Sequence, residues 1–358
     1  MINIVCIGGG TGMAVLLRGL KAAAKSSPVD LSRITAIITM FDDGGSSGKI
    51  VEEYGILPPG DIRNCLVALS DEDQLLSRLF SHRFEGNGSL GGHSVGNLLL
   101  TALTHMNNGD FRKAVYEAGK VLAVKGTILP STLHSATLCA RLTDGRVISG
   151  ESDIRKRSCG TEIDSLFLAP KREGESTVKA LDECLQAIKK AHMIVIGPGS
   201  LYSSLLPNLL VEGVSEAISQ STAIKVYVCN IMTEAGETDG FGVKAHLAEL
   251  VRLGRVVPDW VLVNTEKLHE KALAAYEREG AVQVLPGESD LPQIPGCRIM
   301  GRSLVGEVEI EEIEGKKKVS FHDAGKLGGA ILELAHSSTG YSRNITNGRR
   351  NDVASGAH

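Results

Sequence analysis

The sequence predicts an α/β protein built on a doubly wound, Rossmann-like parallel sheet. Three observations support this. The chain opens on a short apolar run, residues 2–7, which is typical of a buried strand. A glycine-rich turn follows at once, and the apolar spacing from Met13 to Leu20 is then helical. A second apolar run with a glycine corner recurs at residues 192–199. Strand, glycine turn and helix form the first unit of this fold.

The first glycine turn is a candidate phosphate site. It contains Gly9, Gly10, Thr11 and Gly12. Glycines let a phosphate approach the backbone, and the following helix offers free N–H groups and the positive end of its dipole. The alternative is a turn that only closes the strand–helix corner. The third glycine of the dinucleotide fingerprint falls on Met13, which disfavours an NAD-dependent dehydrogenase.

Composition excludes several classes of protein. The 358 residues, 42% hydrophobic with a formal charge of -4, suffice for one large α/β domain or two smaller ones. Aromatic residues make up only 4% and glycines number 41, which suits backbone phosphate loops rather than base-stacking surfaces. Since no basic stripe is present, we expect no nucleic-acid partner.

Cysteine usage and hydropathy indicate the compartment. The 7 cysteines are scattered without a C-x-x-C pair, as expected for reduced thiols. The first apolar run lacks the basic flank of a signal peptide, and no run reaches the ~18 residues of a membrane span. We therefore expect a cytoplasmic protein.

The second predicted strand, residues 34–40, ends in two aspartates. Asp42 or Asp43 can meet a ribose hydroxyl, as acidic residues at this position commonly do. Alternatively, the pair can hold Mg²⁺ together with phosphate oxygens, or the segment with Ser46 and Ser47 is only a solvated turn. The glycine spacing that follows does not match a P-loop.

Two predicted helix starts carry candidate residues. Asp61 is a natural N-cap, and Arg63 and Asn64 follow in the first turn. Because a cation is unfavourable at a helix N-terminus, Arg63 indicates either a ligand anion or a salt bridge to one of the two aspartates. After a glycine-rich loop, His93 and Asn97 open another helix, where a phosphate or sugar can bind. An ordinary cap or surface role is the alternative for His93.

The middle and end of the chain differ in character. Residues 127–172 read as a β-rich excursion from the parallel sheet, with a hairpin at Asp144-Gly145, and serve as a cap or an oligomer contact. We expect residues 1–336 to form one Rossmann-like domain and the chain to form a homo-oligomer. The polar residues 337–358 are expected to be a disordered tail.

The second glycine corner contains Gly197, Pro198, Gly199, Ser200 and Leu201. Ligands of open α/β sheets bind at the carboxyl ends of strands, so we expect a cleft between the two corners. The sequence holds no G-x-S-x-G elbow, no H-E-x-x-H and no zinc-type cysteine–histidine spacing. Any chemistry is therefore expected to be positioning and charge neutralisation of a phosphoryl group.

Several motifs together resemble the 2-phospho-L-lactate transferase-like family. They occur in the family's order, at residues 8–12, 42–48, 59–63, 92–97 and 197–202. The family has a branch that transfers a phospholactyl group from a guanosine diphosphate donor to a deazaflavin. Its other branch, the gluconeogenesis factors, binds UDP-N-acetylglucosamine. Asn230, Thr233 and Thr238 resemble the second branch, with Glu234-Ala235 in place of its usual Gln-Pro or Gln-Ala.

The resemblance implies a cytoplasmic regulator that binds UDP-N-acetylglucosamine or a related nucleotide. In that branch such a protein affects central carbon metabolism, cell shape and cell-wall synthesis. Tyr276 and Arg302 match positions associated with the nucleotide sugar, with an ordinary surface role as the alternative. No cofactor is required under this interpretation. A phosphotransferase with Mg²⁺ at Asp42 and Asp43 is the alternative, and no protein partner is indicated.

Overall fold

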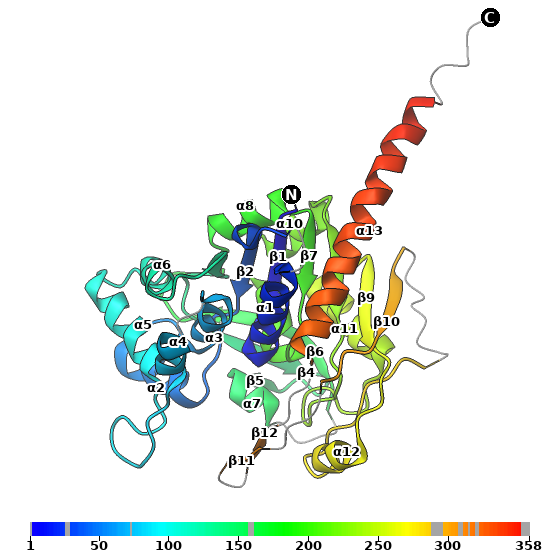
Figure 1. Ribbon diagram of the computed structural model, residues 1–358. Coiled ribbons are helices and arrows are strands. Elements are labelled where there is room, and N and C mark those ends of the chain that lie inside the picture. Colours follow the sequence, from blue (N-terminus) through cyan, green and yellow to red (C-terminus); the bar gives the residue numbers. More distant parts are fainter. Residues whose placement is uncertain are drawn as a thin grey trace, which may run out of the picture.

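A seven-stranded parallel sheet forms the centre of the protein (Figure 1). The computed structural model describes residues 2–25, 29–71, 74–156, 161–287, 296–306, 311–313, 316–318 and 322–351. The strand order is β10-β9-β8-β7-β1-β2-β3, and all neighbours run parallel. The strands are β1 (Ile4–Gly8), β2 (Ile34–Ile38), β3 (Thr127–Pro130), β7 (Met193–Ile196), β8 (Ile224–Val228), β9 (Trp260–Asn264) and β10 (Arg298–Arg302). This confirms the doubly wound sheet, whose order reverses between β1 and β7.

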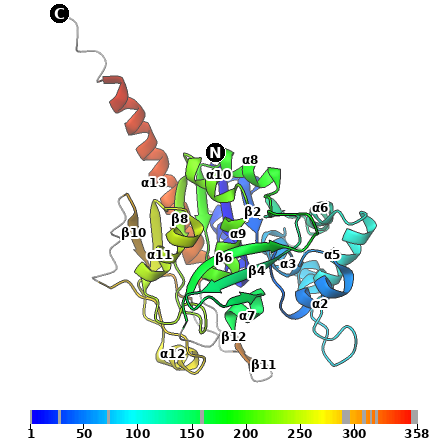
Figure 2. The ribbon, with the colours of Figure 1, turned by 180° about the vertical axis from the view of Figure 1, so that it is seen from behind.

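Helices cover both faces of the sheet. One face carries α1 (Gly10–Ala24), α2 (Gly45–Tyr54), α3 (Gly60–Leu69), α4 (Gln74–Ser81), α5 (Val95–Met106), α6 (Phe111–Val121) and α13 (Ala324–Asn351). The opposite side, seen in Figure 2, carries α8 (Asp182–Lys190), α9 (Leu206–Leu210), α10 (Val214–Gln220) and α11 (Val243–Gly254). The remaining described helices are η1 (Leu31–Arg33), α7 (Glu151–Arg155), η2 (Leu201–Leu205) and α12 (Glu270–Glu277).

The two faces have separate cores because side chains alternate along each strand. In β1, Ile4 and Cys6 pack with Leu17 of α1. Val5 and Ile7 point the other way, into the core beneath α8 to α11. Strands buried on both faces read as continuous apolar runs, which explains why the sequence pattern identified them.

A small antiparallel sheet lies on the face that also carries α8 to α11, and it is in front of the main sheet in the view of Figure 2. It has the order β5-β4-β6, formed by β4 (Ala136–Leu142), β5 (Val147–Ser149) and β6 (Ile163–Pro170). The predicted hairpin at Asp144-Gly145 is therefore present. The predicted start of the excursion at residue 127 is wrong, because β3 pairs parallel with β2 in the main sheet. A short hairpin of β11 (Glu311–Ile313) and β12 (Lys316–Lys318) is also present.

Helix α13 packs directly against α1. A Cβ built on Gly19 would lie 2.0 Å from the carbonyl oxygen of Ala324, so only glycine permits this approach. The helix continues past the predicted domain end at residue 336, to Asn351, and projects beyond the body of the protein (Figure 1). The apolar pattern marks where α13 packs rather than where it ends, and no proline follows to stop it. The disorder of residues 337–358 stays a prediction.

None of the described helices combines the length and apolar character that a membrane crossing requires.

Candidate functional site

A cavity of about 660 Å³ lies at the carboxyl edge of the sheet. The loops after β1, β2, β7 and β8 form its walls, together with α7, residues from 276 to 281 and His322. It therefore sits at the point where the strand order reverses, the usual ligand position in open α/β sheets. Ten residues singled out in the sequence line it: Gly10, Thr11, Gly12, Asp42, Pro198, Gly199, Ser200, Asn230, Thr233 and Tyr276.

The two glycine corners meet in this cavity. A Cβ on Gly12 would lie 2.6 Å from the carbonyl oxygen of Pro198, so a larger residue would push the corners apart. Gly9 is equally constrained, since its Cβ would lie 2.3 Å from Cγ2 of Thr39. The glycines thus permit close backbone approach between loops, in addition to any role toward a ligand.

Asp61 does not cap its own helix, contrary to the prediction. Helix α3 begins at Gly60, one residue earlier, and no side chain caps it. The carboxylate of Asp61 turns to α1 instead, where its Oδ2 accepts the N–H of Gly10 at 2.7 Å. Burial raises the pKa of Asp61 to about 6, although this hydrogen bond opposes the shift. The first N–H group of the glycine turn thus donates to a carboxylate of the protein itself, and not to a ligand.

The adjacent aspartates have different surroundings. Asp42 lines the cavity, and its Oδ1 accepts the N–H of Gly44 at 3.0 Å. Asp43 instead holds the start of α7: its two carboxylate oxygens accept the N–H groups of Glu151 and Ser152, each at 2.9 Å. Of the two aspartates, Asp42 lines the cavity and Asp43 does not.

The positions of these carboxylates determine which of them could hold a metal ion. Across the described part of the chain, no group of three or more His, Cys, Asp or Glu side chains is arranged to hold one. Asp42 and Asp61 both line the cavity, and the charge of Asp42 helps raise the pKa of Asp61. These two carboxylates fit the oxygen ligands of Mg²⁺ when phosphate oxygens complete the coordination. Asp43 does not belong to that set.

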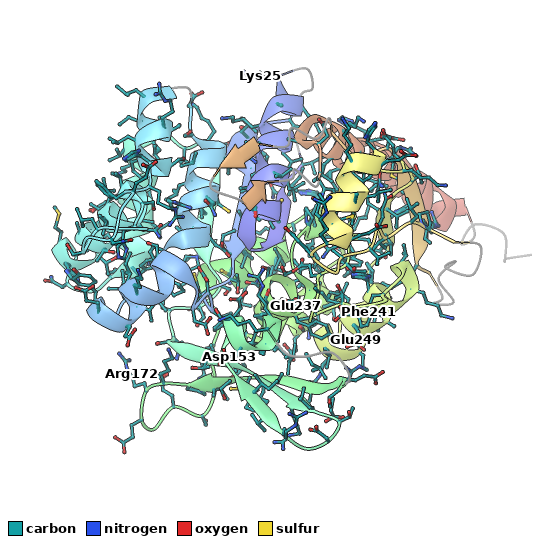
Figure 3. All side chains as sticks on the ribbon, turned by 90° about the horizontal axis from the view of Figure 1, so that it is seen from below. Lys25, Asp153, Arg172, Glu237, Phe241 and Glu249 are labelled. Atoms are coloured by element: carbon teal, nitrogen blue, oxygen red, sulfur yellow. The ribbon has the colours of Figure 1, made fainter. Side chains whose placement is uncertain are left out.

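An acidic cluster that the sequence analysis did not single out as site residues forms another wall. Its members are Glu151, Glu234 and Glu237, with Arg155 between them. Arg155 lies 3.5 Å from Glu151 and 3.6 Å from Glu237. Viewed from below, onto the carboxyl edge, Glu237 lies near the middle of the molecule (Figure 3).

Burial dominates the titration of this cluster. It raises the pKa of Glu151 to about 7, against the opposing charge of Arg155. It raises the pKa of Glu237 to about 8, and the charge of Glu234 adds to the shift. Around neutral pH, protonation of Glu151 and Glu237 therefore reduces the negative charge of the cavity.

The loop after β8 is fixed by its own polar side chains. Glu234 accepts hydrogen bonds from Ser200 at 2.5 Å and from Asn230 at 3.5 Å, which ties this loop to the second glycine corner. The hydroxyl of Thr238 accepts the N–H of Glu234 at 2.9 Å. The hydroxyl of Thr233 likewise accepts the N–H of Val282 at 2.8 Å. Thr238 therefore shapes the cavity wall without lining it.

Several predicted residues form a separate polar cluster. The hydroxyl of Ser46 lies 3.0 Å from Nδ1 of His93 and accepts a hydrogen bond from Asn97 at 3.0 Å. Arg63 is buried and donates to the side chain of Asn64 at 2.6 Å, and the described residues show no ion pair from it to Asp42 or Asp43. The cluster is not part of the cavity wall.

Other predicted residues also lie outside the wall. Ser47 packs against Gly60, whose Cβ would lie 2.4 Å from the Ser47 hydroxyl. Arg302 lies on the surface and pairs with Glu333 of α13, Nε to Oε2 at 3.1 Å. The remaining members of this group are Gly9, Gly197 and Leu201, which belong to the two glycine corners but do not line the cavity.

His322 is a cavity residue that sequence reasoning missed. It follows the β11–β12 hairpin and precedes α13, so nothing in its local pattern marks it. Its side chain is buried, and it lines the cavity beside the loop after β8.

The fold is that of a Rossmann-like α/β protein, with a polar cavity at its topological switch point. Residues 4–305 match the family described as 2-phospho-L-lactate transferase CofD, and the chain belongs to that family.

Two relatives and one solved structure are similar to this chain over nearly its whole length. One from Halalkalibacterium halodurans, named Gluconeogenesis factor, is 46% identical over 92% of this chain and 96% of its own. One from Bacillus subtilis, also named Gluconeogenesis factor, is 42% identical over 93% of this chain and 98% of its own. The crystal structure of a Bacillus halodurans protein, 45% identical, superposes with a TM-score of 0.81 over 92% of this chain and 99% of that one.

Proposed function

We propose that this chain is a cytoplasmic regulator that binds a nucleotide sugar, UDP-N-acetylglucosamine, in the cavity at the switch point. One observation carries the proposal: the two glycine corners and the segment 230–233 line a single cavity. Those are the segments whose sequence resembles the gluconeogenesis factor branch. A role in central carbon metabolism, cell shape and cell-wall synthesis follows from the same resemblance.

The electrostatics of the cavity support binding without a metal. A diphosphate is repelled by ionised carboxylates, and Asp42, Asp61, Glu151, Glu234 and Glu237 all line the walls. The raised pKa values of Glu151 and Glu237 keep these two carboxyl groups partly protonated near pH 7, which removes part of that negative charge. The cations Arg155 and Lys156 line the same cavity and attract phosphate oxygens.

A phosphotransferase is the second candidate. The family description and the two cavity carboxylates, Asp42 and Asp61, favour it. Mg²⁺ held by them would neutralise charge on a transferring phosphoryl group. The sequence offers no activated nucleophile, so the second substrate would have to supply the attacking oxygen.

A thermal-shift panel tests the proposal. UDP-N-acetylglucosamine, UDP-glucose, GDP and NAD are each added with and without EDTA. A ligand at about 100 times its Kd stabilises the folded state by about 2.7 kcal/mol. We expect the largest shift with UDP-N-acetylglucosamine and no effect of EDTA. Equal or larger stabilisation by GDP, or magnesium-dependent consumption of the nucleotide sugar, would favour the transferase instead.

A further inference from the structure

His322 occupies an unusual position in the cavity wall. Its side chain is only 6% exposed, yet it lines the cavity. One side of the imidazole hydrogen-bonds to the backbone of Cys229, at the end of β8. The other nitrogen, Nε2, has no hydrogen-bond partner among the described residues. A buried polar atom without a partner costs free energy, so a ligand atom that pairs with it would be stabilised there.

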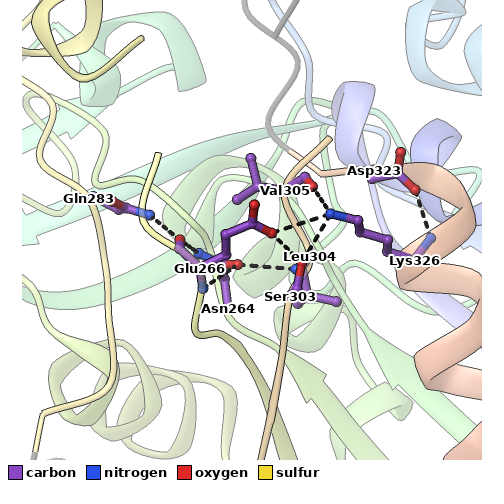
Figure 4. A network of polar contacts seen from close by, with 8 residues as sticks. All are labelled: Asn264, Glu266, Gln283, Ser303, Leu304, Val305, Asp323 and Lys326. Carbon is purple, nitrogen blue, oxygen red and sulfur yellow. Dashed lines mark hydrogen bonds and ion pairs between the residues drawn. The ribbon is translucent and has the colours of Figure 1, made fainter. Parts of the chain in front are cut away.

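A polar network holds the residue that follows His322 in the sequence, Asp323, at the start of α13 (Figure 4). The neighbouring residue, Asp323, donates its N–H to the carbonyl of Leu304 at 2.7 Å and accepts the N–H of Lys326 at 2.7 Å. Leu304 in turn donates to the side chain of Asn264 at 3.1 Å. These contacts tie the start of α13 to the ends of β9 and β10. The backbone next to His322 is therefore anchored, and the hydrogen bond to Cys229 orients the imidazole.

Lys326, in the first turn of α13, adds further contacts to the same network. The ammonium of Lys326 donates to the carbonyl of Val305 at 2.6 Å and lies 3.3 Å from Glu266 (Figure 4). Asn264 also donates to the backbone of Glu266 at 2.7 Å. A residue prepositioned in this way contributes to affinity because little ordering remains to be done on binding.

The chemistry of Nε2 determines what it can bind. Burial lowers the pKa of His322 to about 4, so the ring is neutral at physiological pH. The bond to a backbone carbonyl places the proton on Nδ1, which leaves Nε2 as an acceptor. An acceptor pairs with an N–H or O–H group and disfavours phosphate oxygens, which are acceptors themselves.

We propose that Nε2 of His322 accepts a hydrogen bond from an N–H or O–H group on the sugar or base of the bound nucleotide, and so determines specificity. This rests on the proposed function. The cations Arg155 and Lys156, at the end of α7, come from a different element of the wall and suit the phosphates. The ligand then has one orientation, with its donor-rich part at His322.

Two substitutions separate this role from a purely structural one. In His322→Asn the amide can still donate to Cys229, but the acceptor at the Nε2 position is lost. In His322→Gln an acceptor oxygen can reach the Nε2 position, but the short tether to Cys229 is lost. We expect His322→Asn to bind UDP-N-acetylglucosamine roughly tenfold more weakly, as expected for one hydrogen bond. His322→Gln should retain more of the affinity even if it melts at a lower temperature.

Calorimetric titration of the full chain with UDP-N-acetylglucosamine, UDP-glucose, UDP and GDP provides the test. His336→Asn, at an exposed position of α13, is the matched control. A loss confined to the nucleotide sugars places the donor on the hexose, and a loss that includes UDP places it on the uridine, in its base or its ribose. Equal affinity of wild type and His322→Asn for every ligand bound would overturn the inference, as would a greater loss in His322→Gln than in His322→Asn.

The titrations also distinguish failure of the proposed function from failure of the role proposed for His322. If wild type binds GDP and not the uridine nucleotides, the proposed ligand is wrong, and the same variants titrated with GDP still decide the role of His322. If wild type binds no nucleotide, both are overturned.

Discussion

The backbone N–H of Gly10 donates to the carboxylate of Asp61 at 2.7 Å. This contact joins two residues that the sequence connects to different helices. It places a negative charge at the helix end where the glycine turn suggested a phosphate. The pKa of Asp61, raised by burial to about 6, makes this charge dependent on pH near neutrality.

The first prediction concerns this carboxylate. Ionised Asp61 repels a phosphate at the glycine turn, so the affinity of wild type for UDP-N-acetylglucosamine should fall as the pH rises from 5 to 7. Asp61→Asn should bind roughly tenfold more tightly at pH 7, with a smaller pH dependence. Titration calorimetry at both pH values measures this, with Asp164→Asn on the exposed edge of β6 as control. Weaker binding in Asp61→Asn, together with sensitivity to EDTA, would instead indicate a Mg²⁺ ligand.

The second prediction separates the two adjacent aspartates. Asp42 faces the cavity, so Asp42→Asn should weaken ligand binding by about 1.5–3 kcal/mol with little change in melting temperature. Asp43 caps α7, so Asp43→Ala should lower the free energy of unfolding by about 1 kcal/mol. Thermal melts and titrations on both variants measure the two effects. An equal loss of affinity with unchanged stability in both would show that both carboxylates contact the ligand.

The third prediction concerns the pH dependence of stability. The pKa of Glu237 is raised in the folded state to about 8, mainly by burial. The folded state therefore binds more protons than the unfolded chain between about pH 4.5 and 8, and stability falls as the pH rises through this window. Glu237→Gln should have a flatter profile of melting temperature against pH. An unchanged slope in this variant would mean that Glu237 ionises as easily in the folded state as in the unfolded one.

The fourth prediction concerns the C-terminal segment. The buried residues of α13 extend from Leu327 to Ala335, where it packs on α1. Deleting Ser338 to His358 should therefore change the free energy of unfolding by no more than about 0.5 kcal/mol, and ligand affinity should stay the same. Denaturant unfolding and titration of the truncated chain check both. A clear loss of either would show that the segment docks onto the protein.

Local patterns predicted the central strands of the main sheet and both glycine corners, because the sequence signals for these features lie within a few residues of each other. A buried strand is a continuous apolar run, and a close backbone approach requires glycine, as at Gly12 against Pro198. The start of the excursion was misplaced because the sequence does not record that β3 pairs with β2.

Contacts between distant residues could not be predicted in this way. Asp61 was expected to cap its own helix, and its actual partner, Gly10, lies in the first corner of the chain. Asp43 bonds to Glu151, far away in sequence. His322 follows the β11–β12 hairpin and lies at the cavity, beside the start of α13, which packs on α1. Such placements depend on the whole fold.

A crystal structure of this chain grown with UDP-N-acetylglucosamine tests the central claim most directly. We expect the nucleotide sugar in the cavity, in contact with Gly10 to Gly12, Pro198 to Ser200 and Asn230 to Thr233. The phosphates should lie toward Arg155 and a donor of the sugar or base toward His322. A ligand bound elsewhere on the protein, or an empty cavity at saturating concentration, would contradict the claim.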